Sequence, residues 1–141
     1  MSQLVKKYEA EEEVIQRVRR KILEEFEKMK VVIEDAEISV YTALVDDDVV
    51  RLVLIALDEA KQPLSWRDLK KIFSGIVGED RLRKILSSLK AKNIIAELTH
   101  TRYSLPQYVP VEEIPKIKNP GIIPVIERIH GKRLESYEEI Q

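Results

Sequence analysis

The fold is decided by residues 49–105, which read VVRLVLIALDEAKQPLSWRDLKKIFSGIVGEDRLRKILSSLKAKNIIAELTHTRYSL. Its first part, residues 49–60, is apolar almost all the way round, which predicts a helix buried on several sides. A polar break with a proline ends that helix, because proline cannot continue it. Ser65 with Asp68 three residues later has the pattern of a capping box, which predicts a short amphipathic helix over 66–74.

A tight turn, a basic helix and a hairpin complete this stretch. Gly75 and Gly78 bracket a short connection in which glycine permits positive φ. Apolar residues at steps of three and four then predict a helix over 79–92. Residues 94–98 and 102–105 read as two short strands. Their three-residue connection contains no glycine, which predicts a short hairpin.

This order of elements resembles the winged helix-turn-helix superfamily over residues 49–105. The resemblance rests on element order and apolar spacing and implies a mainly α fold with a small β-hairpin, the wing. Members of the superfamily generally bind duplex DNA, often as dimers, with the third helix in the major groove. Others are protein-interaction modules, so the resemblance implies a fold more directly than a function. A long helix before such a domain is similar in layout to small archaeal transcription regulators.

The N-terminal flank, residues 1–45, predicts a long helix from about Leu4 to Lys30 without Gly or Pro. Its single apolar stripe needs a partner surface. We expect this stripe to pair two subunits as a coiled-coil-like dimer, and packing on the chain's own domain is the alternative. Residues 31–45 fit either a continuation of this helix with a bend near Asp35 or an edge strand, and we favour the helix. The stripe consists of Ile15, Val18, Ile22, Phe26 and Met29.

Asp46, Asp47 and Asp48 open the central domain, residues 46–105. Three carboxylates in a row suggest a metal site. No second acidic or histidine cluster stands at ligand spacing, however. We therefore interpret the acids as an N-cap and as charges that complement the dipole of the following helix.

The C-terminal flank, residues 106–141, contains five of the six prolines between Pro106 and Pro124. Such spacing forbids a regular helix and predicts an extended segment. The segment is too apolar for a solvated linker, so it either folds on the chain's own domain or becomes ordered on a protein partner. Residues 125–130 and 133–140 predict two short helices separated by Gly131.

The composition excludes several classes of protein. The chain has 141 residues, 44% of them hydrophobic and 35% charged, with no cysteine. There is no nucleophile, phosphate-loop or metalloprotease motif, and the two histidines stand alone, so we expect a protein that is not an enzyme and needs no cofactor or metal. No apolar run is long enough for a signal peptide or a membrane span, which favours a cytoplasmic protein with no membrane partner. The abundance of Lys, Glu, Arg, Ile and Val would suit a thermophile.

Positive charge is concentrated in one segment, although the formal net charge of the chain is only −1. Residues 61–92 contain nine basic and three acidic residues, a local charge of +6. This segment includes the helix that would read a major groove. The alternative is a solvated basic face. We interpret Trp66 as an aromatic at the edge of the core in preference to a base-stacking residue. The predicted DNA-binding residues are Arg67, Lys70, Lys71, Arg81, Arg83, Lys84, Ser87, Ser88, His100 and Arg102.

Two hypotheses follow. In the first, the protein is a dimeric winged-helix transcriptional regulator that binds double-stranded DNA, with arginines on guanine edges and lysines and serines on phosphates. In the second, it is a winged-helix module that binds another protein through its long helix or its apolar tail.

Overall fold

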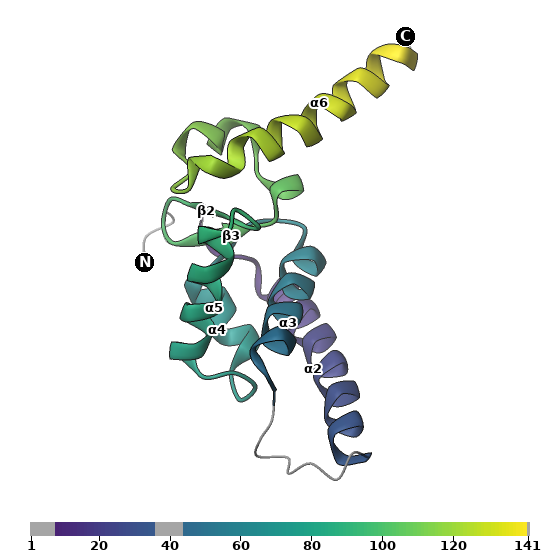
Figure 1. Ribbon diagram of the computed structural model, residues 1–141, viewed down its shortest axis with the longest axis vertical. Coiled ribbons are helices and arrows are strands. Elements are labelled where there is room, and N and C mark those ends of the chain that lie inside the picture. The colour runs from purple at the N-terminus through teal and green to yellow at the C-terminus, as the bar shows by residue number, and fades with distance from the viewer. Residues whose placement is uncertain (1–7, 36–43, 141) are drawn as a thin grey trace.

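The computed structural model describes residues 8–35 and 44–140, with side chains described over 8–29 and 44–131. The described chain is mostly helical, with one small antiparallel sheet between a group of helices and a C-terminal segment (Figure 1). In chain order the elements are α2 (Glu12–Asp35), α3 (Asp46–Ala60), β1 (Leu64–Ser65), α4 (Trp66–Phe73), α5 (Glu79–Ala91), β2 (Ala96–Leu98), β3 (Arg102–Ser104), the 3-10 helices η2 (Pro106–Tyr108), η3 (Val111–Lys116) and η4 (Pro120–Ile122), and α6 (Ile123–Ile140).

Helices α2 to α5 enclose the larger of two apolar clusters. Helix α3 is its centre and buries Val49, Leu52, Val53 and Leu57 completely. Helix α2 packs along both α3 and α4. The prediction that residues 49–60 form a helix buried on several sides is therefore confirmed, because α2 covers the side that α4 and α5 leave open.

The apolar stripe of α2 belongs to this core. Ile15, Val18 and Ile22 are buried against the chain's own helices, and Phe26 and Met29 are partly buried against the same cluster. The assignment of the first three residues to a dimer interface is wrong for this conformation, since they have almost no surface left for a second subunit. Packing on the chain's own domain accounts for the stripe.

A polar contact also fixes α2 on α4. The Nη1 atom of Arg19 donates hydrogen bonds to the carbonyl oxygens of Lys71, Ile72 and Ser74, at 3.2, 2.8 and 2.9 Å. These carbonyls lie at the C-terminal end of α4, where backbone acceptors lack partners within the helix. One arginine of α2 therefore caps the end of its neighbour.

The limits of α2 differ from the expected ones. The helix begins at Glu12, whereas the sequence predicted a start near Leu4, and residues 8–11 are not helical. The backbone N–H of Ala10 donates to Asp68 instead, which draws this segment onto α4. The helix continues to Asp35. Residues 31–35 are therefore helical, which is the alternative that we favoured for them. Two parts of these predictions lie outside the described residues. They are residues 1–7, where the helix was expected to start, and residues 36–43, for which helix and edge strand were the alternatives.

The start of α3 also differs in one detail. Asp46, Asp47 and Asp48 occupy its first turn, where their charges complement the helix dipole. The N-cap is Val45, however, and no side chain caps the helix there. The expected capping role of an aspartate is therefore wrong, because the helix begins one residue earlier than that role requires.

The predicted helices over 66–74 and 79–92 are confirmed as α4 and α5. Ser65 and Asp68 form both hydrogen bonds of a capping box. Between the helices Gly75 has a φ of +79°, which glycine adopts without strain, whereas Gly78 is the N-cap of α5 in extended conformation. Helix α5 ends at Ala91 with Lys92 as its C-cap, and the next residue, Asn93, has a left-handed φ of +57°.

The sheet has the strand order β1-β3-β2. The hairpin of β2 and β3 was predicted. Strand β1, which pairs Leu64 with Tyr103 and Ser65 with Arg102, was not. His100 and Thr101 in the hairpin turn both have positive φ, which a β-branched residue such as Thr101 rarely adopts. The backbone N–H of Trp66 donates to the carbonyl of Thr101 at 2.9 Å and so ties the turn to the start of α4.

The C-terminal segment folds on the chain's own sheet. A second apolar cluster joins Ala96 and Leu98 of β2 to side chains that follow the hairpin, namely Val109, Ile117, Ile122 and Ile126. Four of the five prolines precede, begin or lie within three short 3-10 helices, and Pro124 is the second residue of α6, so the prediction of an extended segment is wrong. The two short helices predicted over 125–130 and 133–140 form one continuous helix, α6. It runs through Gly131 and projects away from the rest of the molecule (Figure 1). Within the described residues, no helix is long and apolar enough to cross a membrane.

Candidate nucleic-acid interface

Helix α5 presents a polar face opposite its buried stripe. Arg83, Lys84, Ser87 and Ser88 are exposed, while Leu82, Ile85, Leu86 and Leu89 are buried in the larger cluster. Within the described part of the chain, none of the four exposed residues takes part in an ion pair. The guanidinium of Arg83 lies 4.8 Å from the centroid of the Trp66 ring, a cation–π distance that leaves its hydrogen-bond donors available. Trp66 itself is partly buried against the core, as predicted.

Arg81, at the start of the same helix, is committed to the chain. Its Nε donates to Oδ1 of Asp46 at 3.0 Å, and its Nη2 donates to the carbonyl of Leu44. The side chain therefore joins the starts of α3 and α5. It is half-buried, and a ligand would have to replace these bonds to engage it.

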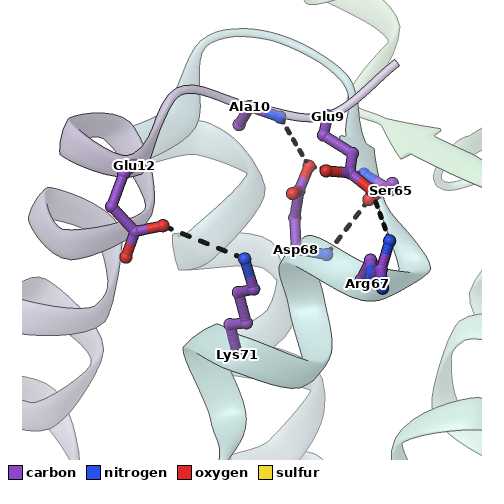
Figure 2. A network of polar contacts seen from close by, with 7 residues as sticks. All are labelled: Glu9, Ala10, Glu12, Ser65, Arg67, Asp68 and Lys71. Carbon is purple, nitrogen blue, oxygen red and sulfur yellow. Dashed lines mark hydrogen bonds and ion pairs between the residues drawn. The ribbon is translucent and has the colours of Figure 1, made fainter. Parts of the chain in front are cut away.

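The basic residues of α4 face acidic residues of the N-terminal segment. Arg67 lies 3.1 Å from Glu9, and Lys71 lies 3.9 Å from Glu12 (Figure 2). Lys70 is half-buried and has no ion-pair partner in the part of the chain that the structure describes. Arg67, Lys71 and Glu12 have more than half of their side chains exposed, and Glu9 has 27% exposed, so each pair contributes at most about 1 kcal/mol. The pairs do reduce the positive potential of α4.

Asp68 joins the N-terminal segment to the start of α4 through Ala10 and Ser65 (Figure 2). Its carboxylate Oδ2 accepts hydrogen bonds from the backbone N–H groups of Ser65 and Ala10, each at 3.0 Å, and its own N–H donates to the Ser65 hydroxyl at 3.0 Å. Burial raises the pKa of Asp68 above its ordinary value of 3.8, and these donors oppose the shift. Asp68 thus holds the N-terminal segment against α4.

Arg102 does not serve the interface. It lies opposite Leu98 in the β2–β3 ladder, and cross-strand partners point to the same face of a sheet. That face is the one covered by the C-terminal segment. The guanidinium donates to Glu113 from Nη1 and Nη2 and to Thr99 from Nε and Nη2, and only 8% of the side chain is exposed. The prediction of a phosphate contact by Arg102 is wrong, because the residue is a buried ion-pair partner.

His100, at the tip of the hairpin, is exposed. Its ring stacks on that of Tyr8 with centroids 3.8 Å apart and an interplanar angle of 24°. The other side of Tyr8 meets Arg102, whose guanidinium carbon lies 5.0 Å from the ring centroid. The hairpin tip is therefore held by the N-terminal segment, and of its two predicted contacts only His100 remains accessible.

The structure thus brings four of the predicted residues together on α5. Others of the predicted residues are bonded to groups of the chain itself. Sequence reasoning missed the acids that engage them, Glu9, Glu12 and Glu113, and the aromatic Tyr8. The acidic run before α2 was visible, but nothing local indicated that it would fold against α4. Among the described residues, no three acidic or histidine side chains converge in a way that could hold a metal ion.

The chain was compared with family models, curated proteins and solved structures, and none of them matches it.

Proposed function

We propose that residues 46–105 form a winged helix-turn-helix domain that binds double-stranded DNA, with α5 as the helix that enters the major groove. The order helix, strand, helix, turn, helix, hairpin supports the assignment, as does a sheet in which β1 joins the hairpin. In this domain β2 and β3 would be the wing. Its position under the C-terminal segment limits it to a supporting role.

The observation that carries the proposal is the exposed face of α5. Two cations, Arg83 and Lys84, and two hydroxyls, Ser87 and Ser88, lie one turn apart on a helix whose other face is buried. An arginine can donate to both acceptors of a guanine edge, and lysine and serine suit phosphate oxygens. None of these groups must break an ion pair with a described residue before it meets DNA.

The basic residues of α4 would be secondary contacts. Arg67 and Lys71 could contact phosphates only by giving up Glu9 and Glu12, which would then lie near the backbone of the DNA. Such contacts would add little affinity, because the acids repel phosphate as the cations attract it. The proposed interface is therefore small and centred on α5.

A cytoplasmic transcriptional regulator that acts as a homodimer remains part of this proposal. The subunits would meet through surfaces other than Ile15, Val18 and Ile22. Two copies would place their α5 helices in successive major grooves about one helical turn apart.

Fluorescence anisotropy with a random-sequence duplex tests the proposal. Binding should weaken between about 50 mM and about 200 mM salt, since bound cations release counterions from DNA. The double variant Arg83→Ala/Lys84→Ala should reduce the slope of log K against log salt concentration by about two. Its affinity at low salt should fall about tenfold or more.

Arg20→Ala/Arg51→Ala is the matched control. It removes the same charge from exposed positions on two other helices, α2 and α3. If both double variants lose equal affinity, the attraction is a general charge effect and α5 is not the interface. Absence of duplex binding at low salt would contradict the proposal altogether.

A second candidate is a protein-binding winged-helix module. The pairing of Arg67, Lys71, Arg81 and Arg102 with groups of the chain favours it, because a DNA-binding surface gains little from cations that are already bound. In this case the anisotropy experiment gives no binding at low salt. The C-terminal segment, with Val111 63% exposed, would be the first surface to test against partners.

A further inference from the structure

Three segments that are distant in the sequence meet around a cavity of about 330 Å³. The N-terminal segment contributes one side chain, the hairpin contributes two, and η3 contributes three. Because the cavity needs all three segments, it exists only when the C-terminal segment is folded on the sheet. Its lining consists of Tyr8, Thr99, Arg102, Glu112, Glu113 and Lys116.

The inner wall of the cavity is rigid. The guanidinium of Arg102 is held by Glu113 and by the carbonyl and hydroxyl oxygens of Thr99. These bonds use four of its five N–H donors. Its side chain is more than nine-tenths buried, and the ring of Tyr8 lies against it. The wall therefore carries a fixed positive group with one donor to spare.

The outer wall carries two charges of opposite sign. Glu112 and Lys116 are exposed, and neither has an ion-pair partner in the part of the chain that the structure describes. The lining as a whole has two cations and two carboxylates, so it has no net charge. Such a wall does not suit a phosphate or another multiply charged anion. It suits a molecule that carries one charge of each sign.

We propose that this cavity binds a small zwitterion with a carboxylate and an ammonium group, such as an α-amino acid. The carboxylate meets Lys116 and the spare donor of Arg102, and the ammonium meets Glu112. The volume stands at the low end of ligand pockets, about 300–1,000 Å³, which limits the ligand to a small molecule.

A ligand that binds only the folded protein stabilises it by RT ln(1 + [L]/Kd), so thermal unfolding reports binding without DNA. Each common amino acid is added separately at about 10 mM, with acetate and ethylamine at the same concentration as single-charge probes. At least one amino acid should raise the melting temperature, and acetate and ethylamine should not. The same amino acid should shift the amide NMR signals of Thr99 and Glu113.

Two variants connect the effect to the outer wall. Glu112→Gln and Lys116→Met change exposed side chains, so both proteins fold, and each should weaken amino-acid binding about tenfold or more because a charge-assisted bond is lost. Lys118→Met and Glu127→Gln are matched controls at exposed positions that do not line the cavity, and they should bind as the parent does.

The proposal is overturned if no amino acid alters either signal. It is also overturned if acetate alone acts as well as the amino acid, which would indicate a carboxylate site, or if binding survives both outer-wall variants unchanged. None of these outcomes depends on duplex binding, so the cavity and the α5 interface can fail separately.

Discussion

Asp68 shows how one carboxylate can serve two purposes at the residue scale. It completes the capping box of α4, and the same oxygen accepts the N–H of Ala10, so the segment before α2 is fixed to the helix that follows Ser65. The residue is only 1% exposed. Burial disfavours the charged form more strongly than the donors favour it, and the pKa of Asp68 is raised as a result.

This shift has a definite consequence for stability. When a group has a higher pKa in the folded than in the unfolded protein, the folded state takes up the proton first as the pH falls. Between about pH 7 and about pH 4, the contribution of Asp68 to the free energy of unfolding should therefore rise on acidification. Asp68→Asn cannot titrate, so the parent should gain stability relative to this variant as the pH is lowered. Urea unfolding at several pH values measures the difference.

Asp47→Asn is the control, because Asp47 is an exposed carboxylate in the first turn of α3. It corrects for the general effect of removing an acidic group. A parent that loses stability relative to Asp68→Asn on acidification would mean that the backbone donors outweigh burial, and the direction of the shift would be reversed.

At the scale of elements, two glycines of the C-terminal segment behave differently. A Cβ added at Gly121 would lie 2.6 Å from Nδ2 of Asn93. The Oδ1 atom of Asn93 accepts a hydrogen bond from Asn119, so its side chain cannot move away without losing that bond. We expect Gly121→Ala to lower the free energy of unfolding by about 1–3 kcal/mol through overpacking. Thermal or urea unfolding measures it.

Gly131→Ala is the matched substitution. An added Cβ there meets nothing within 4 Å, and the residue lies inside α6. Alanine should therefore stabilise the helix by about 0.5–1 kcal/mol, since glycine loses more backbone entropy on folding. If Gly121→Ala proves equally favourable, the Asn93 side chain has moved away at no cost.

The elements that could be predicted are those with a strong internal pattern. The apolar run of α3, the capping box of α4 and the apolar stripe of α5 each specify a helix locally. Strand β1 has only two residues and so has no periodicity. It exists because the extended N-cap residue Ser65 meets the hairpin. In the C-terminal segment the spaced prolines prevent a long α-helix. Pro106, Pro115 and Pro120 start or enter short 3-10 turns, and Pro124 fits the first turn of α6, which the pattern alone did not indicate.

The candidate site was predictable to a similar degree. Helical spacing alone identified the exposed positions of α5. The burial of Arg102 was not found, because it depends on which face of the hairpin the C-terminal segment covers and on Glu113, eleven residues away. The three-residue loop did provide one signal, since it sets Arg102 opposite the apolar Leu98.

At the scale of the whole molecule, the α2 stripe determines whether a subunit is complete by itself. Ile22 is 0% exposed, and its neighbour Leu23 is 37% exposed. Ile22→Asp should abolish cooperative unfolding, because an unpaired buried charge costs several kcal/mol, a large part of a total stability of about 5–15 kcal/mol. Leu23→Asp should stay folded, with a change within about 0.5 kcal/mol. Circular dichroism during heating measures both.

Light scattering on the same two variants tests the alternative that the α2 stripe joins two subunits. If Ile22→Asp stays folded and has half the molar mass of the parent, the stripe joins two subunits in solution and the packing of α2 on α3 is exchanged between chains. If the parent and Leu23→Asp have the mass of one chain, the subunit is self-contained.

The outer edge of β2 also affects how copies of the protein meet. The backbone N–H of Glu97 donates to Oδ1 of Asn119 at 2.9 Å, and its carbonyl accepts the N–H of Lys118 at 2.8 Å. Open strand edges recruit strands from other molecules, and this one is closed by the chain itself. The C-terminal segment therefore protects the edge of β2 from pairing with other molecules. Conditions that release the segment would turn a three-residue strand into a template for intermolecular sheet growth.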